Sequence, residues 1–336
     1  MTTQIATWFV ADEPDQASFF PQIGARSDLP ESQAIYWRCA TVFFASSLAV
    51  NPDRPHLLYT NAALPVVDGV DLALLFDRWG VRIVRLPITR RLATPGEAGW
   101  GNQFYVFDVL RHYVFEQGDD QLVLLDSDCL WLRPVDALSQ AISHHGALTL
   151  PMGEDDHPEG QPINGITREQ LARFAGNFGS LDRSRIEYCG GEILAVDRPT
   201  GARILDHFDT MWPTVMAEAP CAPREEAHLL SAIYSLERIA MGTAEPFIRR
   251  MWTTFRLNNL RPQDEILSIW HLPAEKRTGF ADLFRSIAAH ANLDPRTDTR
   301  EMGLTFASYA SCMGWPRRKP RKFVRDLGLK LRERLS

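Results

Sequence analysis

Two aspartates, Asp126 and Asp128, follow an apolar run in the stretch Gln121 to Leu132, which has the sequence QLVLLDSDCLWL. Such a run, bounded by polar residues, is typical of a strand buried on both faces of a largely parallel sheet. Ligands of open α/β sheets bind at the carboxyl ends of the strands, where these aspartates would lie. Two neighbouring carboxylates repel each other unless a cation lies between them, and divalent cations prefer oxygen ligands. The pair therefore predicts a site for a metal ion and a nucleotide, although an acidic turn that caps the next helix would have the same pattern.

Strand and helix patterns alternate along the chain and must position this pair. Besides the run that leads to the aspartates, the expected strands cover residues 5–10, 56–59, 81–86, 147–150 and 192–196. The expected helices cover residues 32–48, 71–79, 102–116, 135–143 and 225–236, and Gly80 is a stop signal for the second of them. This alternation predicts an α/β fold with a mostly parallel central sheet flanked by helices.

Polar residues also follow the first two expected strands. Asp12 comes after the first, and Tyr59, Thr60 and Asn61 end the second. Because the carboxyl ends of parallel strands meet at one edge of a sheet, these residues are candidates for the nucleotide side of the site. Loop residues without a ligand would satisfy the same pattern.

A more specific pattern covers residues 107–138, which read FDVLRHYVFEQGDDQLVLLDSDCLWLRPVDAL. Asp108 and Arg111 are three residues apart and share one face of a helix, where they could also form a surface ion pair. The stretch resembles the core of DXD-containing glycosyltransferases of GT-A fold, in the mannosyltransferase and toxin-glucosyltransferase branch. There a D-x-L-R helix precedes the DXD strand in this order; residues 117–121 depart from the usual double glycine of that branch.

The resemblance implies a nucleotide diphosphate sugar as donor and Mn²⁺ or Mg²⁺ as cofactor. It implies that Asp126 and Asp128 hold the ion on the donor diphosphate. It also implies that Asp108 and Arg111 contact the sugar and phosphate side of the donor, as catalytic residues.

Two further segments resemble the glycogenin-like branch. The sequence VADE at residues 10–13 is similar to its first strand end, where the aspartate, here Asp12, contacts the nucleotide base. The sequence WHLPAEK at residues 270–276 is similar to its late H-x-x-G-x-x-K motif. That similarity implies that His271 is a metal ligand and that Lys276 binds the diphosphate. The chain departs from the motif at Ala274, in place of glycine, and its lysine is one residue closer.

The segment EYCGGEILAVD, residues 187–197, contains two adjacent glycines before an expected strand. Paired glycines permit a close approach of backbone to a ligand, or simply a tight strand entry. Their position resembles the segment that lines the donor sugar in related enzymes, which makes Glu192 a candidate acid near the reacting carbon. Glu225 and Glu226 begin an expected helix and are candidates for contact with the acceptor.

Charge and cysteine content restrict the class of protein. The chain has a net charge of -6, but residues 317–336 carry nine basic and two acidic residues, a local charge of +7. An acidic body disfavours nucleic acid as a partner. The apolar residues of this basic tail recur at near-helical spacing, which predicts either peripheral contact with an anionic membrane or packing on the rest of the protein. The five cysteines show no CxxC spacing, and no signal peptide is recognised, so we expect a cytoplasmic protein with reduced thiols.

We therefore expect a glycosyltransferase domain over residues 1–314 and a basic amphipathic tail over residues 315–336. A UDP-sugar is the favoured donor, a glycan or glycolipid hydroxyl the expected acceptor, and retention of configuration the expected outcome. Two alternatives stay open: a haloacid-dehalogenase-type phosphatase that uses Asp126 and Asp128 with Glu154, Asp155 and Asp156, and a non-catalytic sugar-nucleotide-binding protein.

Overall fold

The computed structural model describes residues 1–20, 24–92, 101–153, 160–181, 186–217, 221–236 and 241–335. A seven-stranded sheet with strand order β12-β10-β11-β8-β1-β4-β7 forms its centre. Its strands are β1 (Thr3–Phe9), β4 (His56–Thr60), β7 (Arg82–Arg85), β8 (Gln121–Leu125), β10 (Ala147–Thr149), β11 (Ile193–Asp197) and β12 (Gly242–Thr243). All neighbouring strands are parallel except β11, which is antiparallel to β8 and to β10. The predicted mostly parallel sheet is therefore confirmed.

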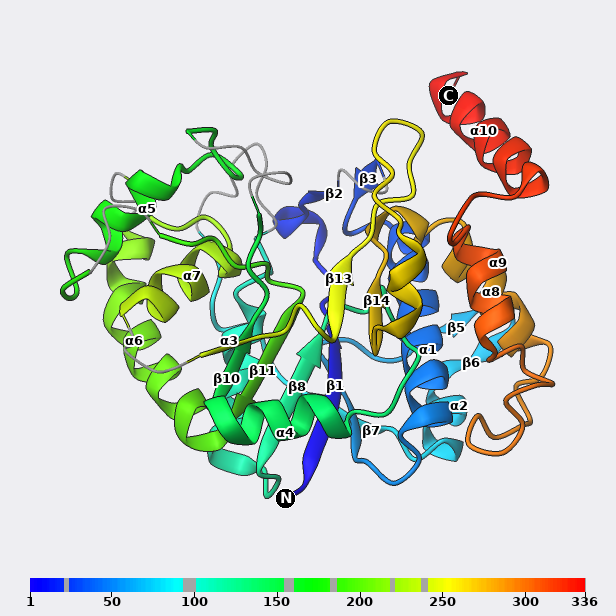
Figure 1. Ribbon diagram of the computed structural model, residues 1–336, viewed down its shortest axis with the longest axis horizontal. Helices are drawn as coiled ribbons and strands as arrows, with labels where there is room; N and C mark the ends of the chain where they lie inside the picture. The colour runs from blue at the N-terminus through cyan, green and yellow to red at the C-terminus, as the bar shows by residue number, and fades with distance from the viewer. Residues whose placement is uncertain are drawn as a thin grey trace.

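Helices cover both faces of this sheet, as Figure 1 shows. On one side lie α1 (Pro30–Val50), α2 (Leu72–Arg78), α8 (Gly279–Ala288) and α9 (Phe306–Met313). On the other side lie α3 (Tyr105–Glu116), α5 (Arg168–Ala175), α6 (Arg198–Met216) and α7 (Glu226–Leu236). Helix α4 (Asp136–His145) follows the aspartate pair and contacts β10, β11 and β12. None of the helices in the described part of the chain is long and apolar enough to cross a membrane.

The central strands contribute alternate side chains to two apolar cores. In β8, Val123 and Leu125 pack in the core that contains α1, whereas Leu122 and Leu124 pack in the core that contains α3. Successive side chains of a strand point to opposite faces, so a strand covered on both sides must be apolar at every position. This requirement explains the uninterrupted apolar run before Asp126.

The apolar run does not form one strand across its whole length. The chain turns at residues 126–128 and continues as β9 (Cys129–Trp131) in a separate three-stranded sheet with β13 (Ile248–Arg250) and β14 (Ile269–His271). In this sheet β9 and β14 are antiparallel, and His271 lies opposite Cys129. The turn that carries the aspartates therefore lies where the two sheets meet.

The remaining elements are short or lie at the end of the chain. Two small hairpins are formed by β2 (Phe19–Phe20) with β3 (Ala25–Arg26) and by β5 (Val66–Val67) with β6 (Val70–Asp71). Short 3₁₀ helices are η1 (Pro14–Gln16), η2 (Pro262–Ile266) and η3 (Pro273–Glu275). Helix α2 ends before Gly80, which has a φ of +68° as the sequence predicts for a stop signal. Helix α10 (Pro320–Leu335) occupies the basic tail and projects from the body in Figure 1.

His56 lies at the start of β4, whereas the aspartate pair follows the end of β8. Its buried ring allows the packing at the start of β4 to be tested. Its ring donates from Nδ1 to the carbonyl of Arg54 and contacts the Ser47 hydroxyl through Nε2, both at 2.8 Å. Burial lowers the pKa of His56 to about 4. Because the folded pKa lies below the unfolded value, the stabilisation is present above pH 6.5 and is lost as the pH falls towards 4.

We expect His56→Gln to cost less stability at acid than at neutral pH. Between pH 7 and pH 4.5 the stability difference from the wild type should shrink by about 2 kcal/mol, because only the wild type must protonate a buried imidazole. Urea unfolding at both pH values measures this difference. An unchanged difference would contradict the assignment of a neutral, buried His56.

Candidate functional site

The turn at residues 126–128 is held by backbone hydrogen bonds from both sheets. The amide of Asp126 donates to the carbonyl of Glu192 at 3.1 Å, just before β11 begins. The amide of Leu272, just after β14, donates to the carbonyl of Asp128 at 3.1 Å. Three segments that are distant in sequence therefore fix the direction of the two carboxylates.

Asp128 is the centre of a buried group of charges. Its Oδ2 lies 2.5 Å from Nζ of Lys276 and 3.2 Å from Nε2 of His271. The side chain of Asp128 is 2% exposed. Burial alone would raise the pKa of this carboxyl, but the positive charges of Lys276 and His271 hold it well below its usual range. The ionised form of Asp128 is therefore favoured by its two partners.

Asp126 and His271 complete this group on the side of the cavity. The Oδ2 atom of Asp126 lies 3.7 Å from Nε2 of His271, and the Asp126 side chain is 35% exposed. Burial and the charge of Asp128 raise the pKa of Asp126 to about 6. Burial opposes a charge on His271, yet Asp128 and Glu192 raise the pKa of its ring to about 9.

A divalent ion fits this donor set. One ligand atom from each of Asp126, Asp128 and His271 lies within 4.8 Å of the other two, so the three side chains are close enough to share one ion. Two carboxylates and one imidazole suit Mn²⁺ or Mg²⁺ better than softer metals. The remaining coordination positions would stay open to water or phosphate oxygens.

Glu192 and Arg250 form the support behind His271. Both carboxylate oxygens of Glu192 accept from the Arg250 guanidinium, at 2.9 and 2.6 Å, and one also lies 3.3 Å from Nδ1 of His271. Burial would raise the pKa of Glu192, but Arg250 and His271 lower it far below its usual range. A carboxylate with these partners is a weak base, and it fixes the orientation of His271 as outer partners of metal ligands do. The predicted catalytic role of Glu192 stays a prediction, and its contacts favour positioning.

Side-chain carboxylates lie close to both glycines of the pair before β11. A Cβ on Gly190 would lie 2.0 Å from Oε2 of Glu192, and a Cβ on Gly191 would lie 2.2 Å from Oε1 of Glu226. Only glycine leaves space for these two carboxylates. The segment that the sequence analysis singled out therefore allows two acids to reach the site.

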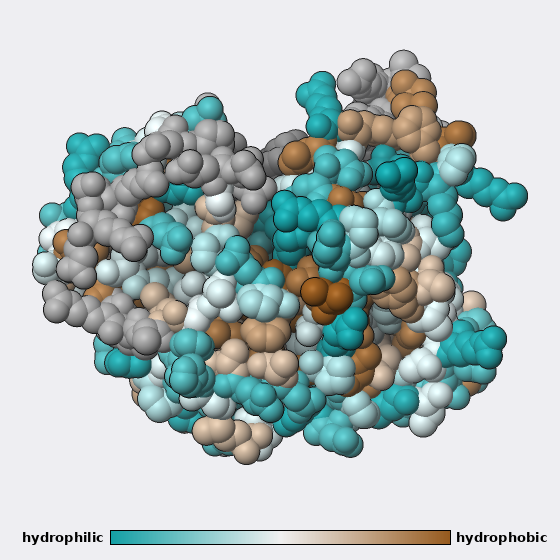
Figure 2. Space-filling view, in the orientation of Figure 1, coloured by the Kyte–Doolittle hydropathy of each residue, from teal (hydrophilic) through white to brown (hydrophobic). Residues whose placement is uncertain are grey.

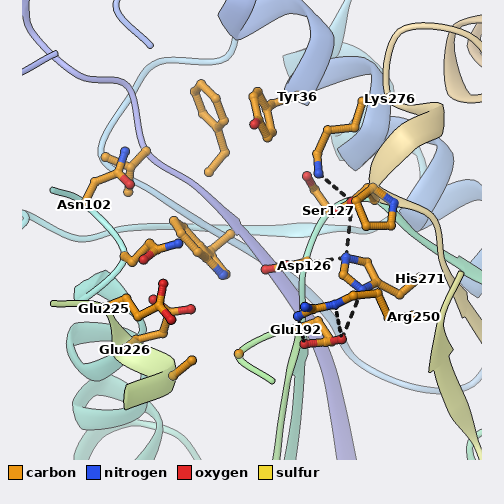
Figure 3. A pocket seen from close by; sticks show the side chains of 18 of the residues that line it. Tyr36, Asn102, Asp126, Ser127, Glu192, Glu225, Glu226, Arg250, His271 and Lys276 are labelled. Atoms are coloured by element: carbon orange, nitrogen blue, oxygen red, sulfur yellow. Dashed lines mark hydrogen bonds and ion pairs between the residues drawn. The ribbon is translucent and has the colours of Figure 1, made fainter. Parts of the chain in front are cut away.

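These residues line a cavity of about 310 Å³, within the usual range of small-ligand sites. Figure 3 shows Lys276, His271 and Arg250 on one side of it and Glu225 and Glu226 on the other. Its aromatic lining comes from β1, from α1 and from two connecting segments, and comprises Trp8, Phe9, Tyr36, Tyr188 and Trp252.

Glu225 and Glu226 form the acidic wall of the cavity at the start of α7. Glu225 accepts from the Tyr188 hydroxyl at 2.5 Å and from Nδ2 of Asn164 at 2.6 Å. Glu226 is 7% exposed, and its Oε2 atom makes no hydrogen bond within the described part of the protein. Burial and the charge of Glu225 raise the pKa of Glu226 well above its usual value. A neutral Glu226 offers both a donor and an acceptor to a hydroxyl-rich ligand.

Asp108 and Arg111 lie away from the lining of this cavity. Asp108 accepts from the backbone amide of Thr89 at 2.9 Å and from the hydroxyl of the same residue. Arg111 forms an ion pair with Asp209 of α6 and is 36% exposed. The shared helix face predicted for them exists, but it faces α6 and the loop after β7. Neither residue belongs to the described lining of the cavity, and their predicted contact with the donor stays a prediction.

The residues at the ends of β1 and β4 hold loops together. Asp12 accepts from the Ser27 hydroxyl at 2.7 Å, from Asn102 at 3.0 Å and from Arg91 at 2.8 Å. Asn61 exchanges two hydrogen bonds of 2.9 Å with the backbone of Ala11 and thereby joins the two strand ends.

Tyr59 and Thr60 are also occupied with protein contacts. The Tyr59 hydroxyl accepts from Gln4 at 2.9 Å, and the Thr60 hydroxyl accepts from the amide of Ala62 at 3.1 Å. Neither residue belongs to the described lining of the cavity, and the same holds for Asp12 and Asn61. Their predicted roles towards the nucleotide stay predictions, and Asp12 comes nearest through its partner Asn102, which does line the cavity.

The sequence analysis missed Arg250 and Trp252 among the lining residues. Arg250 ends a three-residue strand, and Trp252 lies two residues further along the chain. Neither lies in a spaced motif. The register of β13 against β14 places Arg250 opposite His271, and this pairing joins residues that are not close in sequence.

Comparison with known proteins identifies the fold. No protein-family model and no curated protein sequence matches this chain. An active-site mutant of LgtC superposes with a TM-score of 0.50 at 12% identity and covers 89% of this chain and 99% of its own. The galactosyltransferase LgtC in complex with donor and acceptor sugar analogs gives 0.47 at 10% identity with the same coverage. Mouse xyloside xylosyltransferase 1 gives 0.44 at 9% identity, covering 81% of this chain and 97% of its own. The first of these superpositions shows that the chain has the GT-A fold.

Proposed function

We propose that the protein is a metal-dependent glycosyltransferase that moves a sugar from a nucleotide diphosphate donor, preferably a UDP-sugar, to a hydroxyl of a glycan or glycolipid. The observation that carries this proposal is the group of Asp126, Asp128 and His271 beside Lys276, at the carboxyl ends of the strands of a GT-A fold. A cation between two carboxylates suits a diphosphate, which needs positive charge as it leaves.

One wall of the cavity would bind the leaving diphosphate, and the opposite wall would bind sugar hydroxyls. The bond between the anomeric carbon and the diphosphate breaks, the acceptor oxygen bonds to that carbon, and the acceptor loses its proton. Mn²⁺ or Mg²⁺ held by Asp126, Asp128 and His271 would balance the charge on the leaving diphosphate, and Lys276 supports this from the same wall. Glu226, on the opposite wall, binds sugar hydroxyls and orients the donor sugar or the acceptor.

We propose retention of configuration, in line with both branches that the sequence resembles. The leaving diphosphate can accept the acceptor proton on the face from which it departs, so no strong protein base is required. The contacts of Glu192 with Arg250 fit this proposal, because they make Glu192 a poor base.

The phosphatase alternative finds no support in the fold or in the similar structures. Its additional acids, Glu154, Asp155 and Asp156, lie outside the described residues. Incubation with Mn²⁺ and a panel of nucleotide sugars, scored by calorimetry and by slow donor hydrolysis, separates the alternatives. Cleavage of p-nitrophenyl phosphate without binding of any nucleotide sugar would overturn the glycosyltransferase proposal. Donor binding without transfer to any of a range of glycan and glycolipid acceptors would favour a binding protein.

Asp126→Asn should weaken Mn²⁺-dependent UDP binding at least about 10-fold, because it removes one anionic ligand and leaves the side-chain volume unchanged. Calorimetric titration with UDP at fixed Mn²⁺ measures the loss. Asp68→Asn removes the charge of a 52% exposed acid outside the cavity and is the matched control. Equal UDP affinity in the Asp126 variant and the control would exclude Asp126 as a metal ligand.

Glu226→Gln should lower kcat for transfer about 10-fold or more and change UDP affinity by less than about 3-fold. The reason is that Glu226 lies opposite the metal group and would bind the sugar rather than the diphosphate. Steady-state kinetics and UDP titration of the same preparation measure both quantities. Glu245→Gln, at an exposed position, is the control. A variant that loses UDP affinity and keeps kcat would place Glu226 on the nucleotide instead.

We also propose that α10 binds an anionic membrane, on the cytoplasmic face, and brings the site to a membrane-borne acceptor. The helix turns Lys322 and Asp326 towards the body, with side chains 5% and 9% exposed. Three apolar side chains of the helix are exposed instead, at 68% for Val324, 39% for Leu327 and 52% for Leu331. Brown apolar surface on this projecting helix is visible in Figure 2. An exposed apolar face bordered by basic residues matches an interfacial helix.

Val324→Ser with Leu327→Ser should reduce binding to vesicles of phosphatidylcholine and phosphatidylglycerol about 10-fold, since both apolar side chains would leave water on binding. Vesicle flotation measures the bound fraction, which should also fall as salt is raised. Val66→Ser with Leu74→Ser changes a matched pair, each 65% exposed on another surface. Equal loss in both pairs, or binding to pure phosphatidylcholine vesicles at the same level, would refute a specific role of α10.

A further inference from the structure

Glu275 is a buried carboxylate immediately before Lys276 in sequence. It ends η3, the short turn that leads from His271 to Lys276, and is 1% exposed. Its Oε1 accepts from the Thr253 hydroxyl at 2.5 Å, and its Oε2 accepts from the amide of Gly279 at 3.1 Å. Glu275 does not belong to the described lining of the cavity, but the residue after it does.

Thr253 connects Glu275 to a second part of the cavity. It follows Trp252, which lines the cavity, and forms a bridge with Asn258 in the connection between β13 and β14. Through Thr253 and its own backbone, Glu275 therefore contacts both segments that enter the cavity from this side. One segment carries Trp252 and the other carries Lys276.

The cation that balances Glu275 comes from α10. Nζ of Lys322 lies 2.8 Å from Oε2 of Glu275 and 2.9 Å from Oδ2 of Asp326, and the Lys322 side chain is 5% exposed. The same helix contacts the β13–β14 connection through Phe323, whose ring meets that of Phe255 edge-on at 5.0 Å. The basic tail is therefore attached to the site through a buried ion pair.

We propose that Lys322 is a positioning residue of the site, which through Glu275 holds η3 so that Lys276 meets Asp128. This inference rests on the proposed function in one respect, namely that Lys276 serves the diphosphate. A buried carboxylate that loses its cation must recruit another cation or become hydrated. The cation that Glu275 could recruit is Lys276, its neighbour in sequence. Hydration of Glu275 would instead open η3. Either change would remove Lys276 from Asp128.

Lys322→Met keeps the length of the side chain and removes its charge. Lys319→Met makes the same change at an exposed position of the segment that leads into α10 and is the matched control. Lys322→Arg restores a cation and should rescue the site. Glu275→Gln provides a second disruption that leaves no buried anion behind, and it decides the question if Lys322→Met does not fold.

The first measurement is hydrogen exchange of the full-length protein without nucleotide. Peptides that cover residues 251–258 and 272–279 should exchange at least about 5-fold faster in Lys322→Met and in Glu275→Gln, since opening becomes easier. Peptides from β1 and β4 should be unchanged. Rates in Lys322→Met equal to those in Lys319→Met would overturn the proposal.

The second measurement is UDP titration at fixed Mn²⁺. The Kd should rise about 5- to 20-fold in Lys322→Met, stay within about 2-fold in Lys319→Met, and recover in Lys322→Arg. Faster exchange with unchanged UDP affinity would mean that Lys322 supports the fold alone, which overturns its positioning role. If the wild type binds no nucleotide, the proposed function fails, and exchange at residues 272–279 still decides whether Lys322 holds the turn.

Discussion

The buried charge of Asp128 constrains the whole site. A carboxylate that is 2% exposed needs cations close to it, because burial of an unpaired charge is strongly unfavourable. Its two partners come from β14 and from the turn after it, far along the chain from β8. The second sheet, in which β9 lies against β14, brings these residues together. The pairing of β9 with β14 therefore places cations beside Asp128, in addition to packing apolar side chains.

The balance of charge around the cavity explains why a metal ion suits it. Five carboxylates line the cavity, while the described cationic lining consists of Lys276, Arg250 and the titratable His271. Lys276 is bound to Asp128 and Arg250 to Glu192, so Asp126 and the acidic wall at the start of α7 are left in excess. Burial, together with this excess of negative charge, raises the pKa of Asp126 and of Glu226. A divalent cation would relieve the repulsion at Asp126.

The sequence predicts the strand that leads to the site better than it predicts which side chains line the cavity. The buried run before Asp126 has an apolar residue at each position because both faces of β8 are covered, and this pattern is local. Helical spacing puts Asp108 and Arg111 on one face of α3, but it cannot tell which face meets the cavity. In the structure Arg111 pairs with α6, and Asp108 binds the loop after β7. Tyr59 lies in β4, as the strand prediction requires, but its side chain packs in the core that contains α3 and not in the cavity. Arg250 depends on a register between short strands, which no local pattern encodes.

The sequence of the tail also predicts a helix without its orientation. Its amphipathic pattern indicates two faces but does not show which of them contacts the rest of the protein. The structure turns Lys322 and Asp326 towards the body, with side chains 5% and 9% exposed, and leaves Val324 and Leu327 outward. The tail carries +7 and the whole chain -6, so the rest of the chain carries -13, and long-range attraction favours this arrangement. The inward and outward contacts use different faces of α10. A membrane could therefore bind the apolar face while Lys322 stays on Glu275, and attachment to a surface would not require release of the ion pair that supports the site.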